Sequence, residues 1–271
     1  MNKIIKSLLI VFLVLFSIFI SGCSSLVVSQ QYIYDDSNYN IGNKAYNEVV
    51  EEIEIDWIIG NINIVKSSNH EVIVREETDI DIEELYQVHS ILNNKKIDIK
   101  FSGSTLNLDY KYKVKNLYVF LPTTIQKIVI NNVSADIHIN QVEINDLELN
   151  SVSGDIIIED TSINELDLEN VSGEIIILDN KIKDIEIESV SGNIGLSFLG
   201  LPNNFEVSTT SANVTLYIAE DDKITVEFET ISGNLSSKIE YKKVGDSYLF
   251  NGGGITFDAS SISGNLKIID K

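Results

Sequence analysis

The sequence has little positive charge. Its 271 residues include 20 lysines and arginines against 41 aspartates and glutamates, which gives a formal net charge of −21 at pH 7. Arg75 is the only arginine. A nucleic-acid-binding surface must neutralise phosphates with basic side chains, so this composition argues against nucleic acid as a partner. The acidity instead favours solubility, cations or basic partners.

Cysteine and long apolar runs are also scarce. Cys23 is the only cysteine, so a disulfide within the chain is excluded. The run from Leu8 to Ile20 is apolar except for Ser17. It is too short to cross a bilayer comfortably, and its length suits the apolar region of a signal peptide. We therefore predict that residues 1–22 are a signal peptide and do not belong to the fold.

The end of this segment predicts a lipid anchor. Ile20-Ser21-Gly22-Cys23 resembles the bacterial lipobox, in which an aliphatic residue and two small residues precede a lipidated cysteine. The resemblance implies that Cys23 becomes the mature N-terminus and that its acyl chains hold the protein on a membrane, outside the cytoplasm. Residues 23–47 are polar and aperiodic, and we predict that they form a flexible tether.

The familiar catalytic and metal-binding motifs are missing. His70, His89 and His138 have no HExxH or other ligand spacing, and no GxSxG nucleophile motif occurs. The acidic stretch at residues 79–84 lacks the glycine and the ligand spacing of an EF-hand loop, which favours a solvated strand face. We expect no cofactor, no metal and no catalytic residue. The alternative is a polysaccharide-active β-helix enzyme whose carboxylate pair is hidden among the many acids.

A short motif does recur throughout the second half of the chain. It reads VSGD at residues 152–155, VSGE at 171–174 and VSGN at 190–193. Aligned on its second residue, the anchor, the motif has eight versions, at Ile59, Ser134, Ser153, Ser172, Ser191, Ser211, Ser232 and Ser263. From Ser134 onward the steps between anchors are 19, 19, 19, 20, 21 and 31 residues.

Each anchor lies between two stretches of alternating hydrophobicity. In the repeat of Ser153, Leu147 and Leu149 precede the anchor and Ile156 follows it. This pattern predicts a strand with one buried face, a corner and a second inward-facing strand. Glycine or alanine follows every anchor, as expected at a tight bend. One such unit cannot bury its apolar face alone, whereas a stack of units can.

The repeat therefore predicts an all-β fold, a single-chain β-solenoid with coils of about 19 residues stacked ~4.8 Å apart. We assign the solenoid to residues 48–271, with irregular coils at 65–127, where the corner motif is absent, and regular repeats at 128–271. Stacked in sequence order, this length corresponds to about 11 or 12 coils. The last step contains a predicted hairpin insertion, YKKVGDSYLFNGGG, ahead of the final coil.

One column of the alignment carries charge. The residue five positions before the anchor is acidic in seven of the eight repeats and is Val129 in the other. The acidic residues are Glu54, Glu148, Asp167, Glu186, Glu206, Glu227 and Asp258. In stacked coils such like charges repel by about 1 kcal/mol in water. Two interpretations stay open: a solvated face that discourages pairing with other chains, or a stripe that binds divalent cations or cationic peptides.

Aromatic residues gather where the repeats are least regular. Tyr110, Tyr112 and Tyr118 lie within nine positions of one another. Exposed aromatic rings can stack on sugars or anchor a partner. Packing in the end of the solenoid is the other explanation.

The VSGD, VSGE, VSGN and ISGN repeats, together with the strand KNLYVFLP at residues 115–122, resemble the bacterial DUF4097 family of β-strand repeat proteins, which carries an adhesin label. The resemblance implies a surface-attached β-solenoid without established enzymatic activity or agreed binding residues. We therefore expect a lipid-anchored extracytoplasmic protein with a non-catalytic binding, adhesin-like or envelope-stress-sensing role. Its candidate partners are envelope proteins, glycans and cationic peptides.

Overall fold

The computed structural model describes residues 32–67, 70–105, 115–122 and 124–271. The chain separates into two compact units. In the described part of the smaller unit, Tyr32 pairs with Thr105 in an antiparallel bridge, and the rings of Tyr32 and Tyr34 meet edge to face. The larger unit comprises Asp35–Ser104 and Tyr110–Lys271. No helix among the described residues has the length and apolarity needed to cross a membrane.

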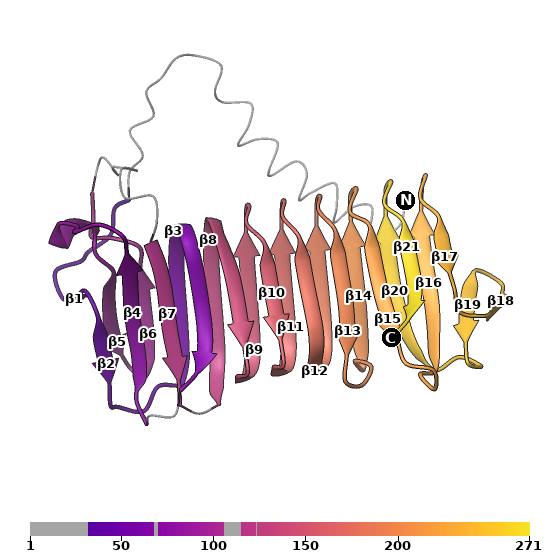
Figure 1. Cartoon of the computed structure of the whole chain (residues 1–271), viewed down its shortest axis with the longest axis horizontal. Helices are drawn as coiled ribbons and strands as arrows, with labels where there is room; N and C mark the ends of the chain where they lie inside the picture. Colours follow the sequence, from indigo (N-terminus) through magenta and orange to yellow (C-terminus); the bar gives the residue numbers. More distant parts are fainter. Residues whose placement is uncertain (1–31, 68–69, 106–114, 123) are drawn as a thin grey trace, which may run out of the picture. The chain divides into compact units, whose positions relative to one another are not determined.

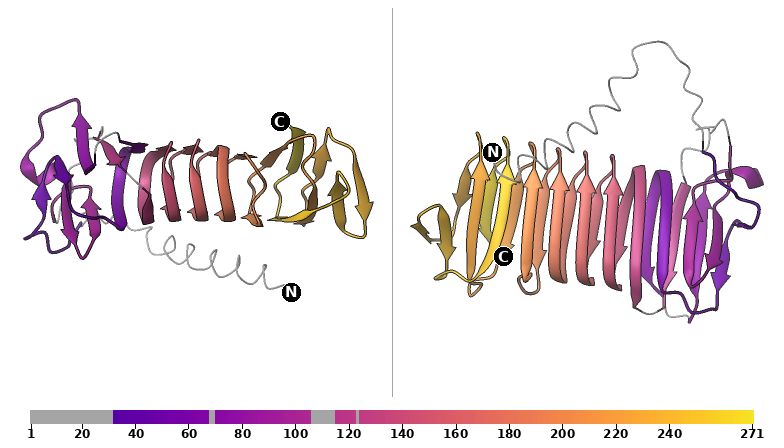
Figure 2. Two further views of the ribbon diagram at one scale, coloured as in Figure 1. Left: turned by 90° about the horizontal axis from the view of Figure 1, so that it is seen from below. Right: turned by 180° about the vertical axis from the view of Figure 1, so that it is seen from behind.

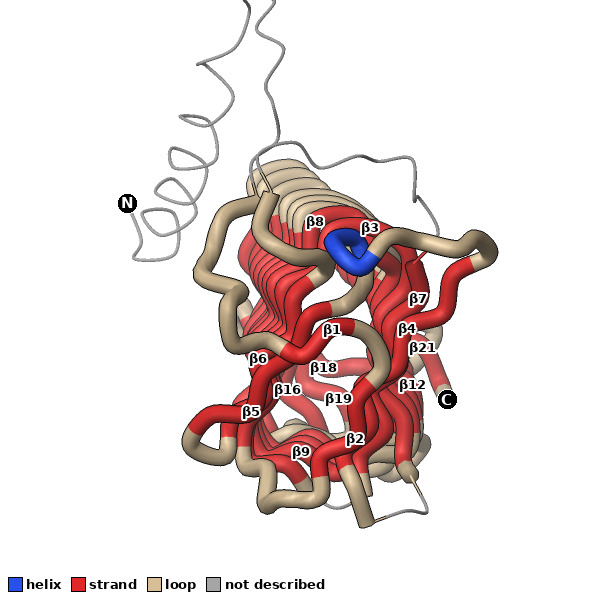
Figure 3. The backbone as a smooth tube through the Cα atoms, turned by 90° about the vertical axis from the view of Figure 1, so that its left-hand side faces the viewer, coloured by secondary structure: helices blue, strands red, loops and turns tan. Residues whose placement is uncertain are grey.

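The larger unit is all-β and is built largely from parallel strands, which stand side by side in a row (Figure 1). Two parallel ladders run along this row. The pre-corner ladder contains the strands that lead into the VSG corners, and the post-corner ladder contains the strands that leave them. Figure 3, viewed along the row, shows these strands as facing walls.

The pre-corner ladder joins nine strands. Their spatial order is β6 (Lys96–Lys100), β3 (Glu52–Lys66), β8 (Ile125–Asn140), β9 (Glu143–Ser151), β11 (Ser162–Asn170), β12 (Ile175–Ser189), β14 (Asn204–Thr209), β20 (Ile255–Ser261) and β16 (Ile224–Thr230).

The post-corner ladder is its counterpart. Its spatial order is β7 (Lys115–Leu121), β3, β8, β10 (Ile156–Glu159), β12, β13 (Ile194–Phe198), β15 (Val214–Ile218), β21 (Leu266–Asp270) and β17 (Leu235–Ser237). Strands β3, β8 and β12 are long enough to take part in both ladders.

The pairing follows the repeat. Leu147 pairs with Leu166, and Leu166 pairs with Ile185, so partners in this part of the ladder are 19 positions apart in the sequence. Leu149 and Ile156 are fully buried, as the alternation predicts. Burial of such a side chain stabilises a fold by about 1.5–3 kcal/mol. The aliphatic columns of neighbouring strands thus form one continuous core.

The corner serine and glycine have separate structural roles. Ser172 donates from its backbone N–H and from Oγ to the same carbonyl oxygen, that of Val152 in the preceding repeat, at 3.1 and 3.2 Å. The Gly173 backbone has φ +118°, and a Cβ there would lie 2.1 Å from the Gly154 carbonyl oxygen. The serine therefore links adjacent corners, and the glycine lets their backbones approach.

Below the corners runs a buried polar column that the sequence reasoning missed. Its members lie two positions before the anchor and include Asn132, Ser151, Asn170, Ser189, Thr209 and Ser261. Asn132 shows what the column does: its Nδ2 donates to the Ala135 carbonyl at 2.7 Å, and its Oδ1 accepts from the Ala135 N–H at 2.9 Å. These small polar side chains satisfy the backbone groups of the bend.

The C-terminal repeats are not stacked in sequence order. β20 pairs with β14 on one side and with β16 on the other, and β21 lies between β15 and β17. The chain thus leaves a gap after residue 218, forms the outer repeat first and then returns to fill the gap. The predicted hairpin exists as β18 (Tyr241–Val244) and β19 (Ser247–Phe250), and β19 pairs antiparallel with β16. The hairpin is therefore an end cap (Figure 2).

The N-terminal half corrects the prediction in the same way. β3 pairs directly with β8, Ile59 opposite Ser134, so residues 65–127 do not form coils between those two repeats. The described strands of this stretch, β4 to β7, lie on the other side of β3, where β6 and β7 (Lys115–Leu121) pair with it. There β4 (Val72–Thr78) is antiparallel to β7, and β5 (His89–Asn93) is antiparallel to β6. The expectation of 11 or 12 coils in sequence order is wrong for this reason. The eight corners form one row, and the antiparallel strands cover its ends. We call β1, β2, β4 and β5 with their connections the N-terminal cap.

The predicted tether at residues 23–47 also extends too far, because its last residues belong to the fold. β1 (Asn40–Ile41) pairs with β5, and β2 (Lys44–Tyr46) pairs with β4. Tyr46 is buried and donates a hydrogen bond from its hydroxyl to Ser90 Oγ at 2.7 Å. The residues around it are polar because they form the outer edge of the cap, and this polarity made them look like a linker.

The N-terminal cap encloses a buried ion pair. The Lys115 side chain is fully buried, and its Nζ lies 2.6 Å from Glu76 Oε2. Nζ also donates to the carbonyl oxygens of Tyr86 and Phe101 and lies over the Trp57 ring, 5.0 Å from its centroid. Burial lowers the pKa of Lys115 to about 8, against the attraction of Glu76. The single-turn 3-10 helix η1 (Glu84–Tyr86) supplies one of these carbonyls.

Candidate functional site

The acidic column predicted from the alignment forms a continuous row in the pre-corner ladder. Glu148 pairs with Asp167, Asp167 with Glu186, and Glu186 with Glu206. The row continues through Asp258, which pairs with both Glu206 and Glu227. Six carboxylates therefore occupy six consecutive strands. Because β20 lies between β14 and β16, Asp258 stands between Glu206 and Glu227, which would be neighbours if the strands followed sequence order.

The seventh acid, Glu54, lies apart from this row. Val129 pairs with Glu54 on one side and with Glu148 on the other, so an aliphatic side chain interrupts the column. Lys96 Nζ also lies 2.6 Å from Glu54 and 2.8 Å from Glu52. Glu54 therefore belongs to a compensated cluster near the N-terminal cap.

Further acids flank the row on the same outward side of the strands. Glu165 pairs with Asp146 and with Asp184, two positions before the row, and Glu169 pairs with Glu188, two positions after it. We call this surface the acidic face, defined by Asp146, Glu148, Glu165, Asp167, Glu169, Asp184, Glu186, Glu188, Glu206, Glu227 and Asp258. Its strands are those labelled β9, β11, β12, β14, β20 and β16 in Figure 1.

The charges of the acidic face lie close enough to repel one another. The pKa of Asp167 is raised by partial burial and by repulsion from Glu148 and Asp146. Partial burial raises the pKa of Glu186, and its neighbours Glu206 and Asp167 add to the effect. Burial and repulsion likewise raise the pKa of Glu188 and of Asp258. Keeping these carboxylates ionised therefore costs free energy in the folded chain.

A compensating cation, Lys127, lies at one end of the face. Lys127 Nζ is 2.9 Å from Asp146 and 3.1 Å from Glu148. Within the described residues, no ion pair involves Asp167, Glu186 or Glu206. The described part of the chain also contains no group of three or more histidine, cysteine or acidic side chains arranged to hold a metal ion. The face thus has the character of an extended charged surface.

The other residues considered from the sequence do not converge on this face. Cys23, Tyr110 and Tyr112 lie outside the described residues. His89 is buried, and its Nδ1 is 3.0 Å from the Gln87 carbonyl oxygen. His138 lies on the post-corner ladder, with Nε2 2.9 Å from Glu159 Oε1.

The acidic stretch at residues 79–84 was predicted to be a strand face, and that prediction is wrong. β4 ends at Thr78, and the 3-10 helix η1 begins at Glu84. The stretch is therefore an irregular connection, and its carboxylates do not share one face of a strand.

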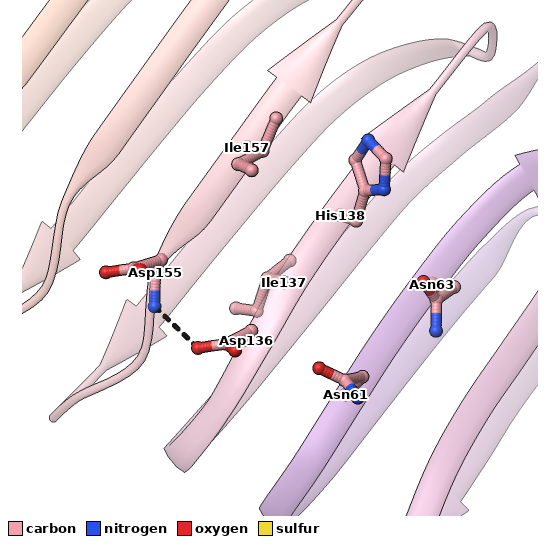
Figure 4. Close-up of a pocket in the computed structure, with 7 residues that line it drawn as sticks. All are labelled: Asn61, Asn63, Asp136, Ile137, His138, Asp155 and Ile157. Atoms are coloured by element: carbon pink, nitrogen blue, oxygen red, sulfur yellow. Dashed lines mark hydrogen bonds between the residues drawn. The ribbon is translucent and has the colours of Figure 1, made fainter.

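A shallow groove lies on the outward side of the post-corner ladder, near its N-terminal end. Its volume is about 240 Å³, and it is lined by Asn61, Asn63, Asp136, Ile137, His138, Asp155 and Ile157 (Figure 4). β3, β8 and β10 supply these residues, except Asp155, which directly precedes β10. The sequence reasoning missed the groove because its two asparagines are 75 positions from the aspartate and histidine that they pair with. The alignment of Ile59 with Ser134 was the available signal.

Comparison with known proteins places the chain in a family. The model of the Toastrack DUF4097 family matches residues 48–269, so the chain belongs to this family. No curated protein matches the chain significantly.

Several solved structures are similar to it over most of its length. A candidate cell adhesion protein from Clostridium sporogenes is 12% identical, with 86% of this chain and 100% of that chain covered and a TM-score of 0.39. A candidate adhesin from Bacteroides fragilis is 13% identical, with coverages of 86% and 97% and a TM-score of 0.42. One from Parabacteroides distasonis is 14% identical, with coverages of 86% and 98% and a TM-score of 0.47.

Proposed function

We propose that this protein is a lipid-anchored, non-catalytic binding protein of the cell envelope that captures positively charged segments of a partner on its acidic face. The observation that carries the proposal is the row of six carboxylates on six consecutive strands, in which the ion pairs of the described residues place one compensating lysine, Lys127, at the Glu148 end. The pKa values of Asp167 and Glu186, raised by partial burial and by repulsion from neighbouring acids, support it, because a cationic partner would relieve the repulsion.

The proposed scaffold is a β-solenoid with coils of about 19 residues in its regular part, which the sequence offset between paired residues supports. Such a scaffold repeats one outward position at each strand, ~4.8 Å apart. An extended basic peptide has side chains of one face about 6.6–6.8 Å apart. Its lysines and arginines could therefore contact several carboxylates of the row without a one-to-one register. Long-range attraction over a surface of this kind speeds association more than it tightens binding.

The first test measures binding of a short oligolysine peptide to the full-length chain. We expect binding that weakens steeply as salt rises, because exposed charges are screened within about 8–10 Å at physiological ionic strength. The double variant Asp167→Asn/Glu186→Gln should weaken binding by up to about tenfold at low salt, corresponding to ~1.4 kcal/mol. An oligoglutamate peptide should not bind.

The matched control removes the same charge elsewhere. Glu174→Gln/Glu220→Gln neutralises two exposed acids outside the acidic face, so it tests the effect of net charge alone. Equal loss in both double variants would show that the face has no special role and would overturn the proposal. If millimolar calcium raises the melting temperature and displaces the peptide from the wild type only, the face is a divalent-cation site instead.

The proposed anchor at Cys23 is tested separately. Wild-type protein should incorporate labelled fatty acid and fractionate with the membrane, and Cys23→Ala should lose both properties. Membrane association that persists unchanged in Cys23→Ala would rule out this anchor without bearing on the acidic face.

A further inference from the structure

Four of the seven residues that line the groove on the post-corner ladder carry side-chain oxygens that can accept hydrogen bonds: Asn61, Asn63, Asp136 and Asp155. Asn61 donates from Nδ2 to Asn116 Oδ1 at 2.6 Å, and Asn63 donates from Nδ2 to the Leu117 carbonyl at 3.2 Å. Both amide nitrogens are thus engaged toward β7, and each amide oxygen remains to accept a hydrogen bond. The two asparagines are held in place by partners outside the groove.

The two aspartates are oriented in a similar way. Asp136 Oδ1 accepts from the Asp155 N–H at 2.9 Å, and Asp155 Oδ1 accepts from the Glu174 N–H at 2.8 Å. Each carboxylate therefore uses one oxygen in the corner ladder and keeps the other. Glu159 accepts from Asn140 Nδ2 at 2.8 Å and contacts His138 Nε2, which orients the imidazole beside the groove. Ile157 forms an apolar wall (Figure 4).

An aromatic surface adjoins these acceptors. Tyr118 on β7 pairs in register with Asn63, so both side chains point to the same side of the ladder. The Tyr118 and Phe120 rings are stacked, with centroids 6.2 Å apart and planes 19° apart. Both side chains are partly exposed. Flat rings next to the planar amide of Asn63 form a surface with one apolar and one hydrogen-bonding part.

We propose that this groove and the Tyr118–Phe120 pair form a binding site for one unit of a neutral or amino sugar in an oligosaccharide. A sugar ring has C–H faces that pack on aromatic rings and adjacent hydroxyls that donate to acceptor oxygens. A volume of about 240 Å³ is below the ~300–1,000 Å³ of typical ligand pockets and suits a single such unit. The two carboxylates exclude uronic acids and other anionic sugars.

A peptide fits this groove less well. β3 pairs with β7 on one side and with β8 on the other, so its backbone cannot add a further strand. Only side chains are available for contact, and a sugar can use them because its hydroxyls point outward on all sides. The site lies on the opposite ladder from the acidic face and does not depend on the function proposed for that face.

The experiment titrates the full-length chain with chitotriose, chitosan trimer, mannotriose and cellotriose, using trigalacturonate as the anionic control. We expect at least one neutral or amino trisaccharide to bind with millimolar affinity or better and trigalacturonate not to bind. Tyr118→Ala and Asn63→Ala should each weaken binding by about tenfold. Tyr217→Ala provides the matched control, because Tyr217 is a partly exposed tyrosine on β15 in the same ladder.

A third variant in the groove guards against misfolding of Tyr118→Ala and Asn63→Ala. Asp136→Asn retains an oxygen that can accept from the Asp155 N–H but removes one charge. It should weaken the chitosan trimer more than the neutral sugars. Melting temperatures identify any variant that fails to fold. The proposal is overturned if no trisaccharide binds, if Tyr118→Ala and Tyr217→Ala have equal effects, or if oligolysine competes for the groove and the sugars do not.

Discussion

The regular repeats and the N-terminal cap fill the space beneath the corner in different ways. In the repeats, two positions before the anchor, small polar side chains such as Ser151 and Ser189 bond the bend from inside. In the first repeat the equivalent residue is Trp57, and the Lys115–Glu76 ion pair lies beside it. A repeat has an identical neighbour whose backbone completes its hydrogen bonds. The end of the stack has no such neighbour and uses large and charged side chains.

The largest expected loss of stability comes from a substitution in the ion pair that the N-terminal cap encloses. Lys115→Met leaves Glu76 buried without its partner, which should destabilise the fold by about 3–5 kcal/mol. The double variant Lys115→Met/Glu76→Gln removes both charges and should recover a large part of the loss. Chemical denaturation measures both. A single variant as stable as the wild type would show that the pair is not the element that closes this end.

A smaller loss of stability is expected from a substitution at the corner of a single repeat. Gly173→Ala adds a methyl group where the backbone has φ +118° and the Gly154 oxygen is 2.1 Å away, so we expect a loss of about 2–3 kcal/mol. Gly195→Ala is the matched control on β13. Its Cβ would meet nothing within 4 Å, and the substitution should be neutral or stabilise by up to about 1 kcal/mol. Equal denaturation midpoints for the two variants would contradict the close approach at the corner.

The smallest effect concerns the acidic face. The folded-state pKa values of Asp167, Glu186, Glu188 and Asp258 are raised. A raised carboxyl pKa means that the stability contributed by the protonated group is lost as pH rises through that pKa. In low salt, lowering the pH from 7 to about 5 should therefore raise the melting temperature, by about 2–4 °C if the net gain is ~1 kcal/mol.

The triple variant Asp167→Asn/Glu186→Gln/Glu188→Gln should lose most of that dependence. The Lys115–Glu76 variants should keep it, because the acidic face is intact in them. A wild-type melting temperature that falls steadily between pH 7 and 5 would contradict the mutual repulsion of these carboxylates.

The candidate sites were accessible from the sequence to different degrees. The acidic row was predicted because all its members have the same offset from the anchor. The groove was not, because Asn63 and His138 become neighbours only when β3 pairs with β8. The buried polar column was overlooked because serine and asparagine at a turn look like ordinary solvent-facing residues.

The sequence by itself determined the local structure of the repeats: alternating strands, a corner at each anchor, a core of Leu147-type and Ile156-type positions and one charged column. These features depend on contacts between a residue and its equivalents one repeat away. The repeat length of a periodic sequence is enough to identify such pairs. Tertiary structure alone decided the order of the strands at both ends. β20 and β21 enter a gap between earlier repeats, and β6 and β7 pair with β3 on the side away from β8, because backbone pairing accepts any strand with the matching alternation.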